Sequence, residues 1–109
     1  DLEDLCAAAE IDAAVAPVPG QVGGSRAGYA RWHAFLERGL ARYAERRNDA
    51  LIDGTSRLSP YLHYGMVSPL RIAVEAAASG RRGADKFLDE LLIWRELAWN
   101  FCFHTRAVD

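Results

Sequence analysis

The stretch "DGTSRLSPYLHYG", from Asp53 to Gly65, combines a glycine, several hydroxyl side chains, an arginine and a proline. Gly54 lets the backbone approach a ligand closely, and the residues after it offer hydroxyl and main-chain N–H groups. Ser59 and Pro60 are typical of a helix start, where free N–H groups and the positive end of the helix dipole favour an anion. From these residues alone, the stretch is either a capped helix start without a ligand or a seat for a phosphate.

The length of 109 residues predicts one small domain with a modest core, since half of the residues are hydrophobic. A net charge of −2 argues against a partner that the whole protein attracts electrostatically. The charge is uneven, however. Residues 1–25 carry five acids and no Lys or Arg, whereas residues 26–57 carry seven Arg and four acids. Only the second segment could attract an anion.

Cys6 and Cys102 are far apart, form no CxxC motif and follow no secretory signal. We therefore expect a reduced, cytoplasmic protein in which both are small hydrophobic residues, with a disulfide between them as the alternative. No apolar run approaches the length of a membrane span. The chain begins without Met and ends after an apolar segment, which favours a piece of a larger protein.

Two Pro and four Gly in "VAPVPGQVGGSRAG" indicate an extended connector after a helix-like start, "LEDLCAAAEI". Residues 1–24 are therefore interpreted as a connector, in which "AAVAPV" is the one β-like pattern of the chain. From Ser25, which fits the N-cap position, to about Asn48 the pattern predicts one helix. Its apolar face comprises Tyr29, Trp32, Leu36, Leu40 and Tyr43.

The opposite face of that helix carries Arg38, Arg42 and Arg46 at four-residue intervals. Like charges at this spacing repel each other and slightly destabilise an isolated helix. Two interpretations are open at this point. The arginines form either a solvated surface, which is the common case, or a stripe that faces a polyanion.

The strings "SPYLHYG" and "SPLRIAVEAAASG" begin and end in the same way. Ser59 and Ser68 fit the N-cap position, and a proline follows each of them at the first helical position. Gly65 and Gly80 fit the C-terminal stops. We expect a first helix of one or two turns and a second helix over residues 69–79, with its inward face made of Ile72, Ala73 and Ala76.

Residues 85–104 form the most apolar segment, with hydrophobic residues over most of the helix circumference. A helix that is apolar nearly all round is typically buried in a larger body. Glu90, Arg95, Glu96 and Asn100 nevertheless lie within it. Because an unpaired buried charge costs several kcal/mol, these polar side chains are expected to be paired or functional.

Two longer strings, "GTSRLSPYLHYGMVSP" and "FLDELLIWRELAWNFCFH", resemble the flavin-binding region of DNA photolyases and their cryptochrome relatives. The resemblance runs from about Val18 to Phe103 and rests on several separate blocks in the same order. It is strongest to the class II cyclobutane pyrimidine dimer photolyases, which carry "LSPYLHFG" and "RELADNFC"-like strings. Where that pattern has an acid, this chain has Trp99, which changes the polar network near the flavin.

This resemblance implies an all-α fold, in which residues 25–109 are the first part of the family's FAD-binding helical domain and residues 1–24 are an interdomain connector. The family consists of light-driven DNA repair lyases with an N-terminal α/β antenna domain and a helical domain that holds FAD; no metal is implied. The resemblance also implies that the whole protein binds damaged DNA, flips a pyrimidine dimer out of the duplex and splits it by electron transfer from reduced FAD.

By resemblance, the FAD phosphates are held by a loop of five residues: Thr55, Ser56, Arg57, Leu58 and Ser59. Tyr43, twelve residues before that loop, matches a tyrosine that also contacts the cofactor. Arg95 matches an arginine near the flavin. From the residues alone, Tyr43 is a core side chain, and Arg95 is the partner of Asp89 or Glu96.

Glu90 matches a glutamate that hydrogen-bonds the lesion base, and Trp94 matches a tryptophan against which the flipped-out dimer packs. Their four-residue spacing places both on one helix face. It also fits the class II pattern, since class I enzymes have a three-residue spacing. Arg47 matches an arginine that touches the DNA backbone. Without the resemblance, Trp94 is a core residue, Glu90 is half of an ion pair and Arg47 is a surface arginine.

Three functions stay open: a photolyase, inactive or weakly active as this chain alone; a cryptochrome-like flavin photoreceptor; and a non-catalytic helical DNA-binding module. The presence of both Glu90 and Trp94 favours the first. We expect no tight FAD binding by the 109 residues alone, because most of the helices that enclose the cofactor in the family are missing. Exposed apolar surface on the last helix is expected to cause self-association.

Overall fold

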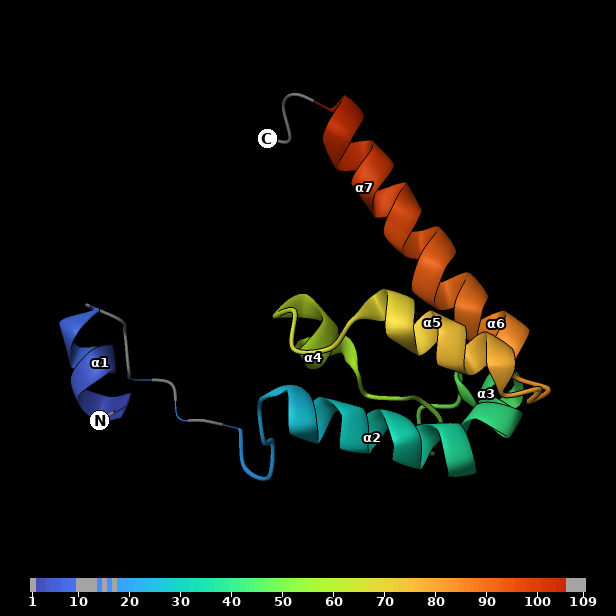
Figure 1. The fold of residues 1–109 in the computed structure, drawn as a ribbon, viewed down its shortest axis with the longest axis horizontal. Coiled ribbons are helices and arrows are strands. Elements are labelled where there is room, and N and C mark those ends of the chain that lie inside the picture. The colour runs from blue at the N-terminus through green and yellow to red at the C-terminus, as the bar shows by residue number, and fades with distance from the viewer. Residues whose placement is uncertain (1, 10–13, 15, 17, 106–109) are drawn as a thin grey trace.

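The computed structural model describes residues 2–9, 14, 16 and 18–105, and every regular element among them is helical, so the predicted all-α fold is confirmed. In chain order the elements are α1 (Leu2–Ala8), α2 (Ser25–Arg38), the 3₁₀ turn η1 (Leu40–Arg42), α3 (Tyr43–Arg46), α4 (Ser59–His63), α5 (Pro69–Ala78), α6 (Ala84–Leu88), the π-helical segment η2 (Asp89–Ile93) and α7 (Trp94–His104). Figure 1 shows α2, α3, α5 and α6 gathered into one body, with α1 set apart from it and α7 running away from it.

Four aromatic side chains form the centre of this body. Trp32 and Phe35 come from α2, Tyr43 from α3 and Phe87 from α6, and at most 8% of each residue is exposed. The ring centroids of Trp32 and Phe87 are 5.3 Å apart, and the Tyr43 ring meets the Phe87 ring edge-on at 5.5 Å. Such pairs stabilise a fold by about 0.5–1.5 kcal/mol beyond the area they bury. The cluster therefore joins three helices that are separated in the sequence.

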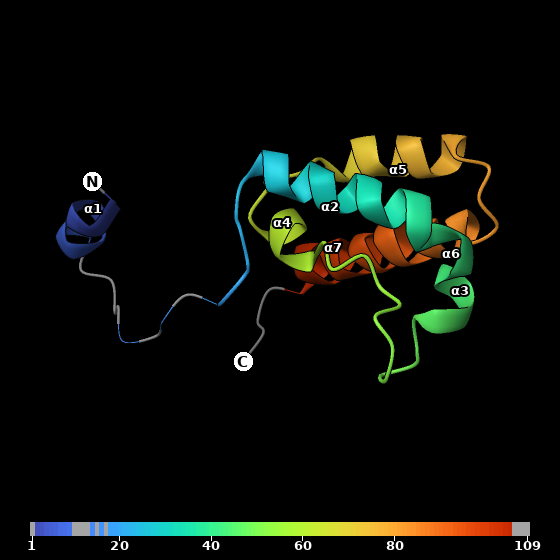
Figure 2. The same cartoon turned by 90° about the horizontal axis from the view of Figure 1, so that it is seen from below.

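Helices α2 and α5 lie side by side in both views (Figures 1 and 2) and are joined by a hydrogen bond. The indole Nε1 of Trp32 donates to Glu75 Oε2 at 2.6 Å, and Arg71 Nε lies 2.7 Å from Glu75 Oε1. The Arg71 guanidinium is the main cause that lowers the pKa of the Glu75 carboxyl, and the indole adds to the effect. The inward face predicted for α5 is confirmed, since its buried residues are Ile72, Ala73 and Ala76.

The single helix predicted over residues 25–48 is interrupted at Gly39, so that prediction is wrong. Helix α2 ends one residue earlier, and η1 and α3 follow. A Cβ at position 39 would lie 2.5 Å from the Phe35 ring, so glycine is what lets the chain turn there. The turn buries Leu40 completely. The arginine stripe predicted on the opposite face of one continuous helix is therefore broken as well.

Three of the five predicted cap and stop residues are confirmed. The Ser68 hydroxyl accepts a hydrogen bond from a main-chain N–H of α5 at 3.3 Å. Gly65 and Gly80 follow α4 and α5 with φ of +65° and +62°, the left-handed region that favours glycine. Helices α2 and α4 do begin at Ser25 and Ser59, but neither hydroxyl caps its helix, so these two cap predictions are wrong.

The helix predicted over residues 85–104 is present as a helical run through α6, η2 and α7. Its first part is buried, since Phe87 is 5% exposed, whereas Trp99 and Phe103 near its end are 71% and 72% exposed. Burial all round is therefore not seen for α7 within the described chain, and the expected exposed apolar surface is confirmed. Among the described residues, no helix combines the length and apolar character that crossing a bilayer requires.

The predicted connector over residues 1–24 is only partly described. Its first part is α1, as the helix-like composition indicates, and residues 18–24 contain neither helix nor strand. Positions 10–13, 15 and 17, which include part of the β-like "AAVAPV", lie outside the described residues. The division of the chain into a connector and a helical domain therefore stays a prediction.

Candidate functional site

The loop between α3 and α4 carries the predicted phosphate-binding residues. Gly54 is buried against the carbonyl of Arg46, where a Cβ would clash with the backbone. At the other end of the loop, Leu58 is 1% exposed and anchors the chain in the core. Between them, Arg57 adopts a φ of +54°, and its Nε lies 2.8 Å from Asp53 Oδ1 in an ion pair. A left-handed arginine is uncommon, and such strain is found preferentially at binding and catalytic sites.

A small hollow of about 120 Å³ lies beside this loop, and we call it the hydroxyl hollow. Its lining consists of Tyr43, Ser56, Ser59, Leu62, Phe87, Glu90 and Leu91. Four of the predicted site residues are thus brought together from α3, the loop, α4 and η2. Tyr43 is 8% exposed and packs its ring against the aromatic cluster. Its interpretation as a core side chain is therefore confirmed, and its contact with the cofactor stays a prediction.

Both carboxylate oxygens of Glu90 are held by cations. Arg47 Nη2 lies 2.7 Å from Glu90 Oε2, and Lys86 Nζ lies 2.8 Å from Glu90 Oε1. Lys86 also lies 2.6 Å from Asp89 Oδ2. The Glu90 side chain is 21% exposed, so the cluster is partly shielded from water. The interpretation of Glu90 as half of an ion pair is therefore confirmed, with cations on both sides of the carboxylate.

The pKa values of the two cations follow from these contacts. The Tyr43 side chain and, more weakly, the Glu90 carboxylate raise the pKa of Arg47. Asp89 first, and Glu90 second, raise the pKa of Lys86. Both cations are therefore charged at neutral pH. Lys86 was not identified from the sequence, although its four-residue spacing from Glu90 is the kind of signal that points to such a pair.

Trp94 follows Glu90 at the first position of α7 and is 60% exposed, so its interpretation as a core residue is wrong for the described chain. The residues between the two belong to η2, whose hydrogen bonds span five residues instead of four. A π-helical turn takes up more residues than an α-helical turn, so residues four apart stay close to one face. Such π-helical turns occur frequently at functional sites.

Arg95 is exposed and does not line the hydroxyl hollow. It lines a separate hollow of about 410 Å³ on α7, together with Glu96, Ala98, Trp99 and Cys102. Within the described residues it forms no ion pair with Asp89 or Glu96, so that alternative is wrong. The described chain therefore does not bring Arg95 to the other predicted cofactor residues. Trp99, which departs from the class II pattern, shares its surface.

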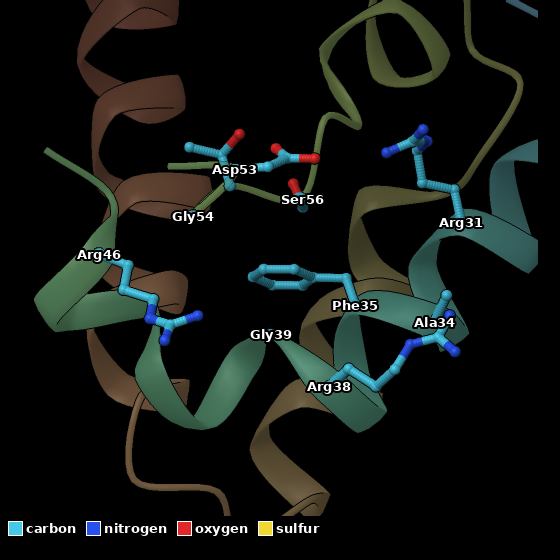
Figure 3. Close-up of a pocket in the computed structure, with 10 residues that line it drawn as sticks. Arg31, Ala34, Phe35, Arg38, Gly39, Arg46, Asp53, Gly54 and Ser56 are labelled. Atoms are coloured by element: carbon cyan, nitrogen blue, oxygen red, sulfur yellow. The ribbon is translucent and has the colours of Figure 1, made fainter. Parts of the chain in front are cut away.

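A larger hollow of about 500 Å³, which we call the arginine hollow, lies between α2, α3 and the loop (Figure 3) and was not predicted. It is lined by Arg31, Ala34, Phe35, Arg38, Gly39, Arg46, Asp53, Gly54, Thr55 and Ser56. Thr55 lines this hollow instead of the hydroxyl hollow, and Ser56 lines both. The signal in the sequence is the seven-residue spacing of Arg31 and Arg38, which places both on one face of α2. The prediction of one long helix instead placed Arg38 on a common face with Arg42.

Comparison with curated proteins finds relatives named deoxyribodipyrimidine photo-lyase. The chain is 44% identical over 81 residues to that of Thermus thermophilus, 38% identical over 96 residues to that of Arabidopsis thaliana and 32% identical over 103 residues to that of Potorous tridactylus. These matches cover 74%, 84% and 92% of this chain and 19% of each relative, so the chain spans about a fifth of their length. No family model and no solved structure matches.

The resemblance seen in the sequence motifs is confirmed by these relatives at the level of the family, because each match covers most of the chain. The names of these relatives do not distinguish classes of photolyase, so the class II assignment stays a prediction. The roles carried over to individual residues also stay predictions, whichever hollow those residues line. The chain belongs to the deoxyribodipyrimidine photolyase family.

Proposed function

We propose that this chain holds the flavin phosphates and forms one wall of the lesion pocket in a light-dependent enzyme that splits cyclobutane pyrimidine dimers in damaged DNA. The observation that carries the proposal is the hydroxyl hollow, where Tyr43, Ser56 and Ser59 lie next to Glu90. The names of the relatives support the reaction. The four-residue spacing from Glu90 to Trp94 supports class II, and the two free cysteines support a reducing cytoplasm.

The residues of the hydroxyl hollow fit a phosphate group. Three residues that carry hydroxyl groups, Ser56, Ser59 and Tyr43, line it, whereas Leu58 is 1% exposed and does not line it. The volume of about 120 Å³ is well below the ~300–1,000 Å³ of sites that enclose a whole small molecule. The hollow therefore suits the phosphates of FAD and not its ring systems, which supports weak binding of FAD by the 109 residues alone.

When bound, reduced FAD supplies the electron that opens the cyclobutane ring, and the residues of the chain position the lesion. Arg47 and Lys86 fix the Glu90 carboxylate, one on each oxygen. If Arg47 turns to a DNA phosphate, it must leave Glu90, and this frees one carboxylate oxygen to accept a hydrogen bond from the lesion base. The exposed ring of Trp94 offers a stacking surface for the flipped-out dimer.

Light-dependent repair by the intact protein tests this proposal. An oligonucleotide with one cyclobutane dimer is incubated with the protein under light that the flavin absorbs and, as the control, in the dark. We expect the dimer to be lost in the light alone. A flavin-containing protein without repair would indicate a cryptochrome-like photoreceptor, and a protein without flavin absorbance would indicate a non-catalytic DNA-binding module; either result contradicts the proposal.

A further inference from the structure

Three arginines line the arginine hollow. Arg31 and Arg38 come from α2 and Arg46 from the end of α3, and Figure 3 shows them on both sides of the Phe35 ring. All three side chains are exposed. Within the described residues, none of the three forms an ion pair.

The balance of charge in this hollow is positive. Asp53 is the one acid among the lining residues, and Arg57 already holds its carboxylate at 2.8 Å. Other arginines of the same body are paired: Arg47 with Glu90, Arg71 with Glu75 and Arg82 with Glu45. The three arginines thus line one hollow without an ion-pair partner among the residues that the structure describes, and their like charges disfavour this arrangement unless an anion binds.

Two glycines hold this arrangement in place. Gly39 ends α2 against the Phe35 ring, and Gly54 brings the loop against the carbonyl of Arg46. Phe35 is 8% exposed and forms the floor between the arginines. The volume of about 500 Å³ lies within the ~300–1,000 Å³ range of small-molecule sites. The walls of the hollow are therefore set by close backbone contacts and a buried ring.

We propose that the arginine hollow binds a phosphate ester through Arg31, Arg38 and Arg46, at a site separate from the hydroxyl hollow. A guanidinium is always charged and donates two parallel hydrogen bonds to phosphate oxygens, which makes it the residue type best suited to this ligand. The two hollows share Ser56 alone among their lining residues. Thr55 and Ser56 of the arginine hollow also belong to the loop predicted to hold the FAD phosphates, but the three arginines have no part in the proposed repair function, so the inference goes beyond it.

Two sources can provide the phosphate: a free phosphorylated molecule or the phosphodiester backbone of a nucleic acid strand. Inorganic pyrophosphate and a short single-stranded oligonucleotide represent the two sources in the test. Both are titrated into the intact protein at low and at physiological salt, with binding measured by calorimetry. Because the arginines are exposed, we expect binding by either probe to weaken strongly as salt rises.

The decisive comparison is between two triple variants that remove the same charge. The test variant carries Arg31→Gln, Arg38→Gln and Arg46→Gln. The control variant replaces three exposed arginines outside the hollow that also lack an ion pair in the described chain: Arg26, Arg42 and Arg81. A charge pair about 4 Å apart in water is worth about a fivefold factor in affinity, so the test variant should bind roughly 100-fold more weakly than the control.

The outcomes distinguish the arginine hollow from the hydroxyl hollow, which is proposed to hold the flavin phosphates. Loss of pyrophosphate binding or of oligonucleotide binding in the test variant alone supports the proposal and identifies the source. Equal losses in both variants would show a non-specific effect of net charge and overturn it, as would the absence of binding to both probes at millimolar concentration. The flavin content of the test variant is expected to equal that of the wild type; a parallel loss of flavin would show one shared site and overturn the separation.

Discussion

Helices α6 and α7 belong to one helical run, yet they have opposite environments. In α6, Phe87 is 5% exposed and contacts three aromatic rings, whereas in α7, Phe103 is 72% exposed. Both helices are rich in apolar residues, so composition does not distinguish them. The difference lies in what surrounds them: α2, η1, α3 and α5 enclose α6, and α7 runs away from that body (Figure 1).

The change from buried to exposed takes place at η2, where the ion-paired Glu90 lies. The candidate site is thus at the edge of the stable body, with one wall fixed by the core and the next helix turn open. This placement positions Glu90 rigidly through Arg47 and Lys86 and leaves the ring of Trp94 accessible. If burial determines how much each half contributes to stability, substitutions in α6 should lower the free energy of unfolding more than substitutions in α7.

The largest effect is expected from Phe87→Ala in the 109-residue chain. Removing a buried phenylalanine leaves a cavity inside the aromatic cluster, which costs about 3–5 kcal/mol in the free energy of unfolding. The matched control is Phe103→Ala in the exposed half, where we expect a change within about 0.5 kcal/mol. Denaturant unfolding measures both. Equal losses in the free energy of unfolding for the two variants would contradict the difference between α6 and α7.

A smaller effect is expected at Arg57, whose φ of +54° is enforced by the loop. Replacement by Asn and by Val removes the ion pair with Asp53 in both cases, but Asn tolerates the left-handed conformation and the β-branched Val does not. The Val variant should be less stable than the Asn variant by about 1–2 kcal/mol in the free energy of unfolding. Equal stabilities would mean that the loop relaxes and is not held rigidly by the core.

The smallest effect is a pH dependence at Glu75, in the link between α2 and α5. Because Arg71 lowers the pKa of the folded carboxyl, ionised Glu75 contributes stability above its unfolded pKa of about 4.3. That contribution is lost as the pH falls through the lowered folded pKa. The stability difference between the wild type and Glu75→Gln should therefore shrink between about pH 5 and pH 3. A difference that grows on acidification would contradict this account.

Several local features of the fold were predictable, although the caps predicted at Ser25 and Ser59 were wrong. Ser68 caps α5, Gly65 and Gly80 follow their helices, and the buried face of α5 follows from its periodicity. The break at Gly39 was missed because the apolar spacing continues across it, up to Tyr43. Gly39 is itself a local marker of a helix end, and its contact with the Phe35 ring four residues earlier is local as well, but the prediction gave more weight to the apolar spacing.

The site was predictable to the extent that its residues resemble a family pattern. The four-residue spacing of Glu90 and Trp94 belongs to that pattern, and the roles assigned to the two residues stay predictions. The π-helical turn between them was not predicted, because it has no marker such as Gly or Pro. Lys86 was missed although its spacing from Glu90 is regular. The spacing of Arg31 and Arg38 indicates a shared helix face, but the approach of Arg46 to the same hollow depends on the bend at Gly39 and could not be predicted from one continuous helix.

The most direct test of the central claim is the repair yield of Glu90→Ala in the intact protein, with Glu96→Ala on exposed α7 as the control. If Glu90 hydrogen-bonds the lesion during the reaction, the yield of dimer splitting per absorbed photon should fall about tenfold or more. Affinity for dimer-containing DNA should stay the same or rise, since Arg47 loses its protein partner. An unchanged yield, or a loss explained fully by weaker DNA binding, would contradict the role assigned to Glu90.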